Sequence, residues 1–118
     1  MKGSDRVAVL GLGDFGYHLA CELQQLGHEV LAVDRNRDKV QHILPNVTKA
    51  AVADVSDRSA LEELGIASFD IVAVSVGERL ETAVLLVHHL RQLQTPRILV
   101  KVANEEQAAI VKLVGATE

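Results

Sequence analysis

A glycine-rich turn placed directly behind an apolar run constrains the fold of this chain more than any other feature. Residues 7–10 read Val-Ala-Val-Leu, and residues 11–16 read Gly-Leu-Gly-Asp-Phe-Gly. In such a turn the first glycine allows a tight bend, the second lets a pyrophosphate approach the backbone, and the third lets the new helix pack closely against its strand. The free N–H groups of that helix then attract phosphate. We therefore expect Gly11, Gly13 and Gly16 around a phosphate.

An acidic residue at the end of the next apolar run completes the pattern. Asp34 follows the run Val-Leu-Ala-Val at residues 30–33, and a carboxylate in that place can accept hydrogen bonds from ribose hydroxyls. The same carboxylate would repel a 2′-phosphate, so NADP is disfavoured, although the neighbouring Arg35 weakens that exclusion. The glycines and Asp34 together predict a site for an adenine nucleotide.

Apolar runs and amphipathic stretches alternate along the rest of the chain, which predicts the order βαβαβαβαβα. We expect strands at residues 6–10, 29–33, 49–53, 70–76 and 97–103. We expect helices at residues 14–26 and from about 36 to the proline at 45. A third helix should follow residues 54–57 and stop at the glycine at 65, a fourth should run from about 80 to before the proline at 96, and the last should cover 105–114. The strands are continuously apolar, as in a parallel sheet covered on both faces. The predicted fold is α/β, a Rossmann-like doubly wound parallel sheet with right-handed crossovers and the strand order 3-2-1-4-5.

The carboxyl ends of these strands should meet at a crevice above strands 1 and 4, so the loop residues there are candidates for ligand binding. Besides the glycines, Asp34 and Arg35, the candidates are Asp14, Phe15, Asp54, Val76 and Gly77. Three of the candidates have a plainer alternative. Asp34 could simply end its strand, Asp54 could only cap the helix that follows it, and Gly77 could only form a turn.

Composition excludes several other classes of function. The chain has 118 residues, enough for one domain with its own core, and no apolar run approaches the length of a membrane span. A net charge of −4 and only three aromatic residues argue against a nucleic-acid partner. The single cysteine, Cys21, cannot form an intramolecular disulfide and indicates the reducing cytoplasm. The adjacent His88 and His89 would point to different sides of a helix, so we assign no catalytic residue and no metal ligand.

Three segments of the chain form a more specific pattern: Gly-Leu-Gly-Asp-Phe-Gly at 11–16, Gly-His-Glu-Val-Leu-Ala-Val-Asp at 27–34, and Asp-Val-Ser-Asp at 54–57 with Leu-Gly-Ile at 64–66. Together they resemble one particular family, the RCK, KTN or TrkA-N regulatory domain of Ktr and Trk potassium transporters and of potassium channels. The resemblance continues through residues 69–77 and 113–116, so it covers essentially the whole chain.

The resemblance implies a nucleotide sensor that is not an enzyme. Domains of this family bind NAD(H), ADP or ATP, form homodimers that assemble into a larger ring, and act on a membrane-embedded potassium-transport subunit from the cytoplasmic face of the membrane. Carried over by position, the three glycines would hold phosphate, Asp34 the ribose, and Asp54 the edge of the adenine. Lys101, expected on strand 5, matches a position where a basic residue can approach the phosphates.

The sequence departs from the family pattern in two respects. Asp14 stands where family members that bind ATP often carry a basic residue, and a carboxylate there would repel a terminal phosphate unless a cation intervened; this favours NAD(H) or ADP modestly. From the resemblance we also expect residues 1–118 to be the family's N-terminal nucleotide-binding domain, without the sixth strand and the C-terminal lobe. Two alternatives remain: the NAD-binding half of a dehydrogenase without its catalytic domain, and a structural dimerisation module with a vestigial pocket.

Overall fold

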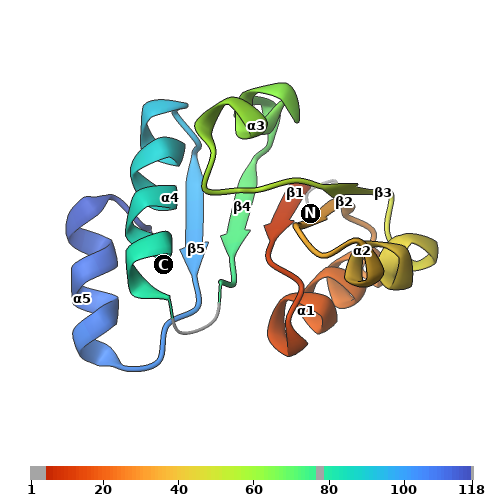
Figure 1. Ribbon diagram of the computed structural model, residues 1–118, viewed down its shortest axis with the longest axis horizontal. Coiled ribbons are helices and arrows are strands. Elements are labelled where there is room, and N and C mark those ends of the chain that lie inside the picture. Colours follow the sequence, from red (N-terminus) through yellow and green to blue (C-terminus); the bar gives the residue numbers. More distant parts are fainter. Residues whose placement is uncertain (1–4, 77–78, 118) are drawn as a thin grey trace.

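The structure is a computed structural model that describes residues 5–76 and 79–117 (Figure 1). The strands of the described part are β1 (Arg6–Leu10), β2 (Glu29–Asp34), β3 (Lys49–Val52), β4 (Ile71–Val74) and β5 (Arg97–Val100). The α-helices are α1 (Asp14–Gln25), α2 (Arg37–Ile43), α3 (Arg58–Glu63), α4 (Leu80–Gln92) and α5 (Glu105–Val114). Two short 3₁₀ turns, η1 (Leu44–Asn46) and η2 (Ile66–Ser68), follow α2 and α3.

The strands form one parallel sheet in the order β3-β2-β1-β4-β5, which confirms the predicted topology. β1 lies at its centre, where Val7 is opposite Val30 of β2 and Ile71 of β4. The first three strands are added in sequence from β1 outwards to β3, at one edge of the sheet. The chain then crosses back, so that β4 pairs with the other side of β1 and the direction of strand order reverses. In a sheet of this topology a ligand binds where the order reverses, at the carboxyl ends of the strands.

Helices cover both faces of the sheet because side chains along each buried strand point alternately to opposite sides. Val7 and Val9 of β1 pack on one face with residues of α1 and α2, including Ala20 and Val40. The other face packs against α3, α4 and α5, and its cluster includes these fully or nearly fully buried residues: Ala8, Leu10, Leu61, Leu86, Leu90 and Val111. Figure 1 shows α4 and α5 lying next to each other beside β5. The predicted two-sided burial is confirmed for the three central strands β1, β2 and β4, whereas the edge strands β3 and β5 are partly exposed.

Some element boundaries differ from the prediction. β4 and β5 are shorter than expected, and Lys101, expected on strand 5, lies one residue beyond β5. Its backbone N–H still donates to the carbonyl oxygen of Val74, so parallel pairing extends just past the strand. Pro45 lies within η1 rather than ending α2 directly, because proline is well tolerated in the first turn of a helix. Asn36 caps α2 as predicted and accepts hydrogen bonds from the N–H groups of Asp38 and Lys39.

Over the same described ranges, no helix combines the length and the apolar character that crossing a bilayer requires.

Candidate functional site

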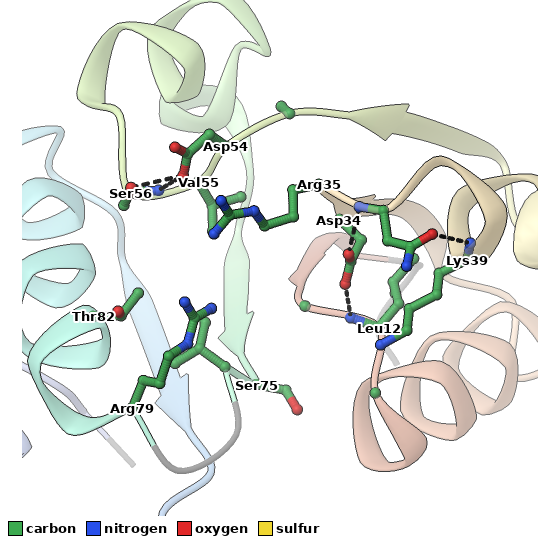
Figure 2. Close-up of a pocket in the computed structure, with 15 residues that line it drawn as sticks. Leu12, Asp34, Arg35, Lys39, Asp54, Val55, Ser56, Ser75, Arg79 and Thr82 are labelled. Carbon is green, nitrogen blue, oxygen red and sulfur yellow. Dashed lines mark hydrogen bonds between the residues drawn. The ribbon is translucent and has the colours of Figure 1, made fainter.

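A cleft of about 380 Å³ opens at the carboxyl ends of the strands, where the chain order of the sheet reverses (Figure 2). The structure brings together at this cleft six residues that the sequence singled out: Gly11, Gly13, Asp34, Arg35, Asp54 and Val76. They come from four different loops, which follow β1, β2, β3 and β4. Gly77 lies outside the described residues.

The three glycines of the turn have different surroundings. Gly11 has a φ of +103°, and a Cβ built on it would collide with the carbonyl oxygen of Ser75. A Cβ on Gly16 would collide with the carbonyl oxygen of Gly11, so α1 sits directly against the turn. A Cβ on Gly13 would meet nothing within 4 Å. Gly11 therefore makes the bend and Gly16 the close helix packing, whereas Gly13 leaves open space at the cleft.

Asp34 ties two of the loops together. Its Oδ2 accepts a hydrogen bond of 2.8 Å from the N–H of Leu12 in the glycine turn, and its Oδ1 accepts one of 2.8 Å from the N–H of Asn36. Each carboxylate oxygen can accept more than one hydrogen bond, so both keep capacity for a ligand hydroxyl. Asp34 therefore does more than end its strand: it fixes the glycine turn relative to the start of α2.

Asp54 does not cap α3. That position belongs to Asp57, whose side chain accepts a hydrogen bond from the N–H of Ser59. Oδ1 of Asp54 instead accepts hydrogen bonds from the backbone N–H of Ser56 at 3.0 Å and from its hydroxyl at 2.6 Å. These two bonds, with the weaker influence of Arg35 and Arg79, outweigh the slight desolvation of this exposed carboxylate and lower the pKa of Asp54 below its ordinary value of 3.8. Asp54 is thus an ionised carboxylate at neutral pH.

Three cationic side chains line the cleft: Arg35, Lys39 and Arg79. The ion pairs of the described part of the chain lie elsewhere, joining Arg6 to Glu29 and Arg58 to Glu62. The cleft therefore has three cations against the two carboxylates of Asp34 and Asp54, although the whole chain has a net charge of −4. A site of this kind attracts an anion.

Sequence reasoning missed Lys39, Ser56, Arg79 and Thr82, which also line the cleft. Lys39 lies in the first turn of α2, and Arg79 directly precedes α4. Both residues come shortly after the carboxyl end of a strand that reaches the cleft, β2 for Lys39 and β4 for Arg79. That short separation in sequence could have marked them as candidates. Ser56 lies within the Asp-Val-Ser-Asp segment, and its partnership with Asp54 depends on a turn that the segment itself makes.

Four sequence candidates do not line the cleft: Gly16, whose packing against the turn is described above, and Asp14, Phe15 and Lys101. Asp14 opens α1 and lines an adjoining hollow of about 370 Å³ together with Tyr17, Asp38, Lys39 and His42. Phe15 is half exposed, and the Nζ of Lys101 lies 5.8 Å from the centroid of its ring. Within residues 5–76 and 79–117, no group of three or more His, Cys, Asp or Glu side chains is placed to hold a metal ion.

Curated relatives with similar sequences include potassium-uptake proteins. It is 38% identical over 109 residues to Ktr system potassium uptake protein A of Bacillus subtilis (strain 168), an alignment that covers 92% of this chain and 49% of that protein. The chain thus spans about half the length of the curated relatives it matches.

Solved structures share the fold. The NAD(P)-binding domain of an exopolyphosphatase-related protein from Archaeoglobus fulgidus has a TM-score of 0.83 and 25% identity, covering 96% of this chain and 84% of that one. The GsuK channel bound to NAD has a TM-score of 0.81 and 19% identity over 98% of this chain and 21% of that one. GsuK bound to ADP has a TM-score of 0.82 and 18% identity, covering 99% of this chain and 31% of that one. A saccharopine dehydrogenase from Saccharomyces cerevisiae also matches, with a TM-score of 0.70 and 20% identity over 92% and 24%.

Below 25% identity these likenesses show only the fold, which the channel and the dehydrogenase have in common. The family is decided by the sequence, because nearly the whole chain, residues 7–118, matches a single family description. The chain belongs to the TrkA-N domain family.

Proposed function

We propose that this chain is a cytoplasmic regulatory domain that binds an adenine nucleotide and controls a membrane-embedded potassium-transport subunit. The observation that carries the proposal is the cleft itself. It combines an open phosphate-type turn at Gly13, a ribose-type carboxylate at Asp34 and an excess of cationic side chains. Phosphate, ribose hydroxyls and negative charge are the three features that such a cleft recognises.

The comparisons support this assignment of ligand and partner. A relative at 38% identity is named a potassium uptake protein, and structures of the same fold are described as bound to NAD and to ADP. The candidate ligands are therefore NAD(H), ADP and ATP. Asp14 adds a negative charge at the start of α1, next to the turn, and favours NAD(H) or ADP over ATP.

Control of transport needs a difference between two ligand states. A nucleotide shifts a homo-oligomer between conformations only to the extent that it binds one of them more tightly. We propose that the chain forms homodimers that assemble into a ring on the inner face of the membrane. Two nucleotides with different phosphate ends would then stabilise different forms of that ring.

Ligand-dependent thermal unfolding tests the binding step. A ligand present at 100 times its Kd stabilises the folded state by about 2.7 kcal/mol, which corresponds to a rise in Tm on the order of 10 °C for a domain of this size. Melting curves with NADH, NAD, ADP and ATP, repeated by calorimetry, would rank the ligands. If none of the four raises the Tm at millimolar concentration, the chain is a structural module and the proposed sensing function is wrong.

The transport step has its own test. Potassium uptake by cells that express the membrane subunit and the full-length regulatory protein should change when this domain carries a substitution that abolishes nucleotide binding. Unchanged uptake would refute regulation while leaving binding intact.

The proposed domain is not an enzyme. The competing function, the NAD-binding half of a dehydrogenase, is supported by fold likeness alone. It would be recognised if the full-length protein consumed NADH in the presence of a carbonyl or imine substrate, a result that the regulatory proposal does not allow.

A further inference from the structure

Arg79 is the feature of the cleft that the glycine turn and Asp34 do not explain. It holds the N-cap position of α4, but its side chain makes no capping hydrogen bond. Figure 2 shows its guanidinium group pointing into the cleft, towards the guanidinium group of Arg35 on the opposite wall. Neither group belongs to the ion pairs found among the described residues. Two like charges thus face the same space, and the Asp54 carboxylate is close enough to both to feel their charge.

The position of the two arginines along the cleft indicates which part of a ligand they meet. Figure 2 shows Leu12 of the glycine turn at one end of the cleft, Asp34 next to it, and Asp54, Arg35 and Arg79 towards the other end. A nucleotide with its phosphates on the turn and its ribose on Asp34 directs its base to that other end. Val55 lies at that end and Val76 also lines the cleft, so the cleft has the apolar lining that a planar heterocycle needs.

Guanidinium groups stack on aromatic rings, and an aromatic ring attracts a cation on each of its faces. We propose that Arg35 and Arg79 hold the purine base of the bound nucleotide between their guanidinium groups, as a clamp across the cleft. The electron-rich faces of the ring would lie between two like charges and so reduce the repulsion between them. This inference rests on the proposed function, and it makes Arg79 a ligand-contacting residue.

The carboxylate at the edge of the clamp suits adenine. Oδ1 of Asp54 already accepts two hydrogen bonds from Ser56, at 3.0 and 2.6 Å, which leaves Oδ2 as its free acceptor. One free acceptor matches the single exocyclic amino group of adenine.

Isothermal calorimetry with adenosine and ADP tests the clamp, because adenosine has the base and the ribose but no phosphate. Arg79→Gln and Arg35→Gln should each weaken both ligands by a similar factor, about 3- to 30-fold for the loss of a cation over an aromatic ring. Arg79→Lys should recover only part of the affinity, because an ammonium lacks the planar stacking surface. Arg37→Gln is the matched control: Arg37 is exposed on α2 and does not line the cleft, so both affinities should stay within about twofold of the wild type.

Two results would overturn the clamp. If Arg79→Gln weakens ADP but leaves adenosine unchanged, the guanidinium group contacts phosphate and not the base. If it changes neither affinity while the variant keeps the wild-type Tm, Arg79 lies outside the site. Failure of the proposed function looks different, because the wild-type protein itself would then bind neither adenosine nor ADP.

Discussion

Replacing Asp34 with alanine should change stability and ligand binding together, because one carboxylate serves both. The change leaves the N–H groups of Leu12 and Asn36 without their acceptor. Asp34 is half-buried, so water can reach part of the vacated space, and we expect a loss of about 1–3 kcal/mol in the free energy of unfolding. For a domain of this length that lowers the Tm by about 4–12 °C.

The same substitution removes the acceptor for the ribose hydroxyls. A hydrogen bond to a charged group contributes about 1.5–3 kcal/mol, so the affinity for ADP should fall about 10- to 100-fold. Urea unfolding without ligand gives the first quantity, and calorimetry at a temperature where the variant is fully folded gives the second.

Asp70→Ala provides the matched control. The Oδ2 of Asp70 also accepts a hydrogen bond of 2.8 Å from a backbone N–H, that of Arg6, but at the amino end of β1 and away from the cleft. We expect a smaller loss of stability, about 0.5–1.5 kcal/mol, and no change in affinity. The reasoning fails if Asp34→Ala keeps the wild-type affinity, or if Asp70→Ala weakens ADP binding as strongly as Asp34→Ala does.

Three further predictions use the same cleft. Gly16→Ala should lower the free energy of unfolding by about 1–3 kcal/mol in urea titrations, because its Cβ meets the backbone of the turn, whereas Gly13→Ala should keep its stability and lose ADP affinity in calorimetry. Ser56→Ala should raise the pKa of Asp54 towards 3.8 in an NMR titration; in the wild type the lowered pKa adds stability that is present above pH 3.8 and lost as the pH falls through the folded-state pKa. Asp14→Asn should improve ATP affinity relative to ADP by about fivefold, measured by competition, because it removes about 1 kcal/mol of repulsion.

The fold could be predicted from the sequence because its signals are local and repeated. Continuous apolar runs marked each strand, and the glycine turn together with the right-handed crossover rule fixed the order of the sheet. The ends of β4 and β5 could not be placed, because Val76 and the apolar residues after Val100 give the sequence no signal for where each strand ends. Asp57 rather than Asp54 caps α3, since two acidic residues three positions apart compete for the same role.

The site was predictable where the backbone determines it and less so where side chains do. Gly11, Gly13 and Asp34 reach the cleft because the ends of β1 and β2 are there. Lys39 and Arg79 were missed, because the direction of a long side chain depends on the surrounding loops and not on its own sequence neighbours. Lys101, another candidate from the sequence, lies near the carboxyl edge of the sheet beside Phe15 and does not line the cleft, so its proposed approach to phosphate stays a prediction.

The contact between Gly11 and Ser75 bears on how such a domain could move. The N–H of Gly11 donates to the carbonyl oxygen of Val33, the N–H of Ser75 donates to that of Leu10, and the two residues are too close to admit a Cβ on Gly11. The floor of the cleft is thus held by backbone hydrogen bonds and close packing to β1, β2 and β4, which leaves little room for movement there. If a nucleotide moves this domain, we therefore expect the movement in the loops around the opening of the cleft. The start of α4, which Arg79 precedes, is the helix end nearest to the proposed base site. A hinge beneath the ligand would break the sheet, whereas a shift of α4 would pass directly to its neighbour α5 and so to the outer surface of the domain.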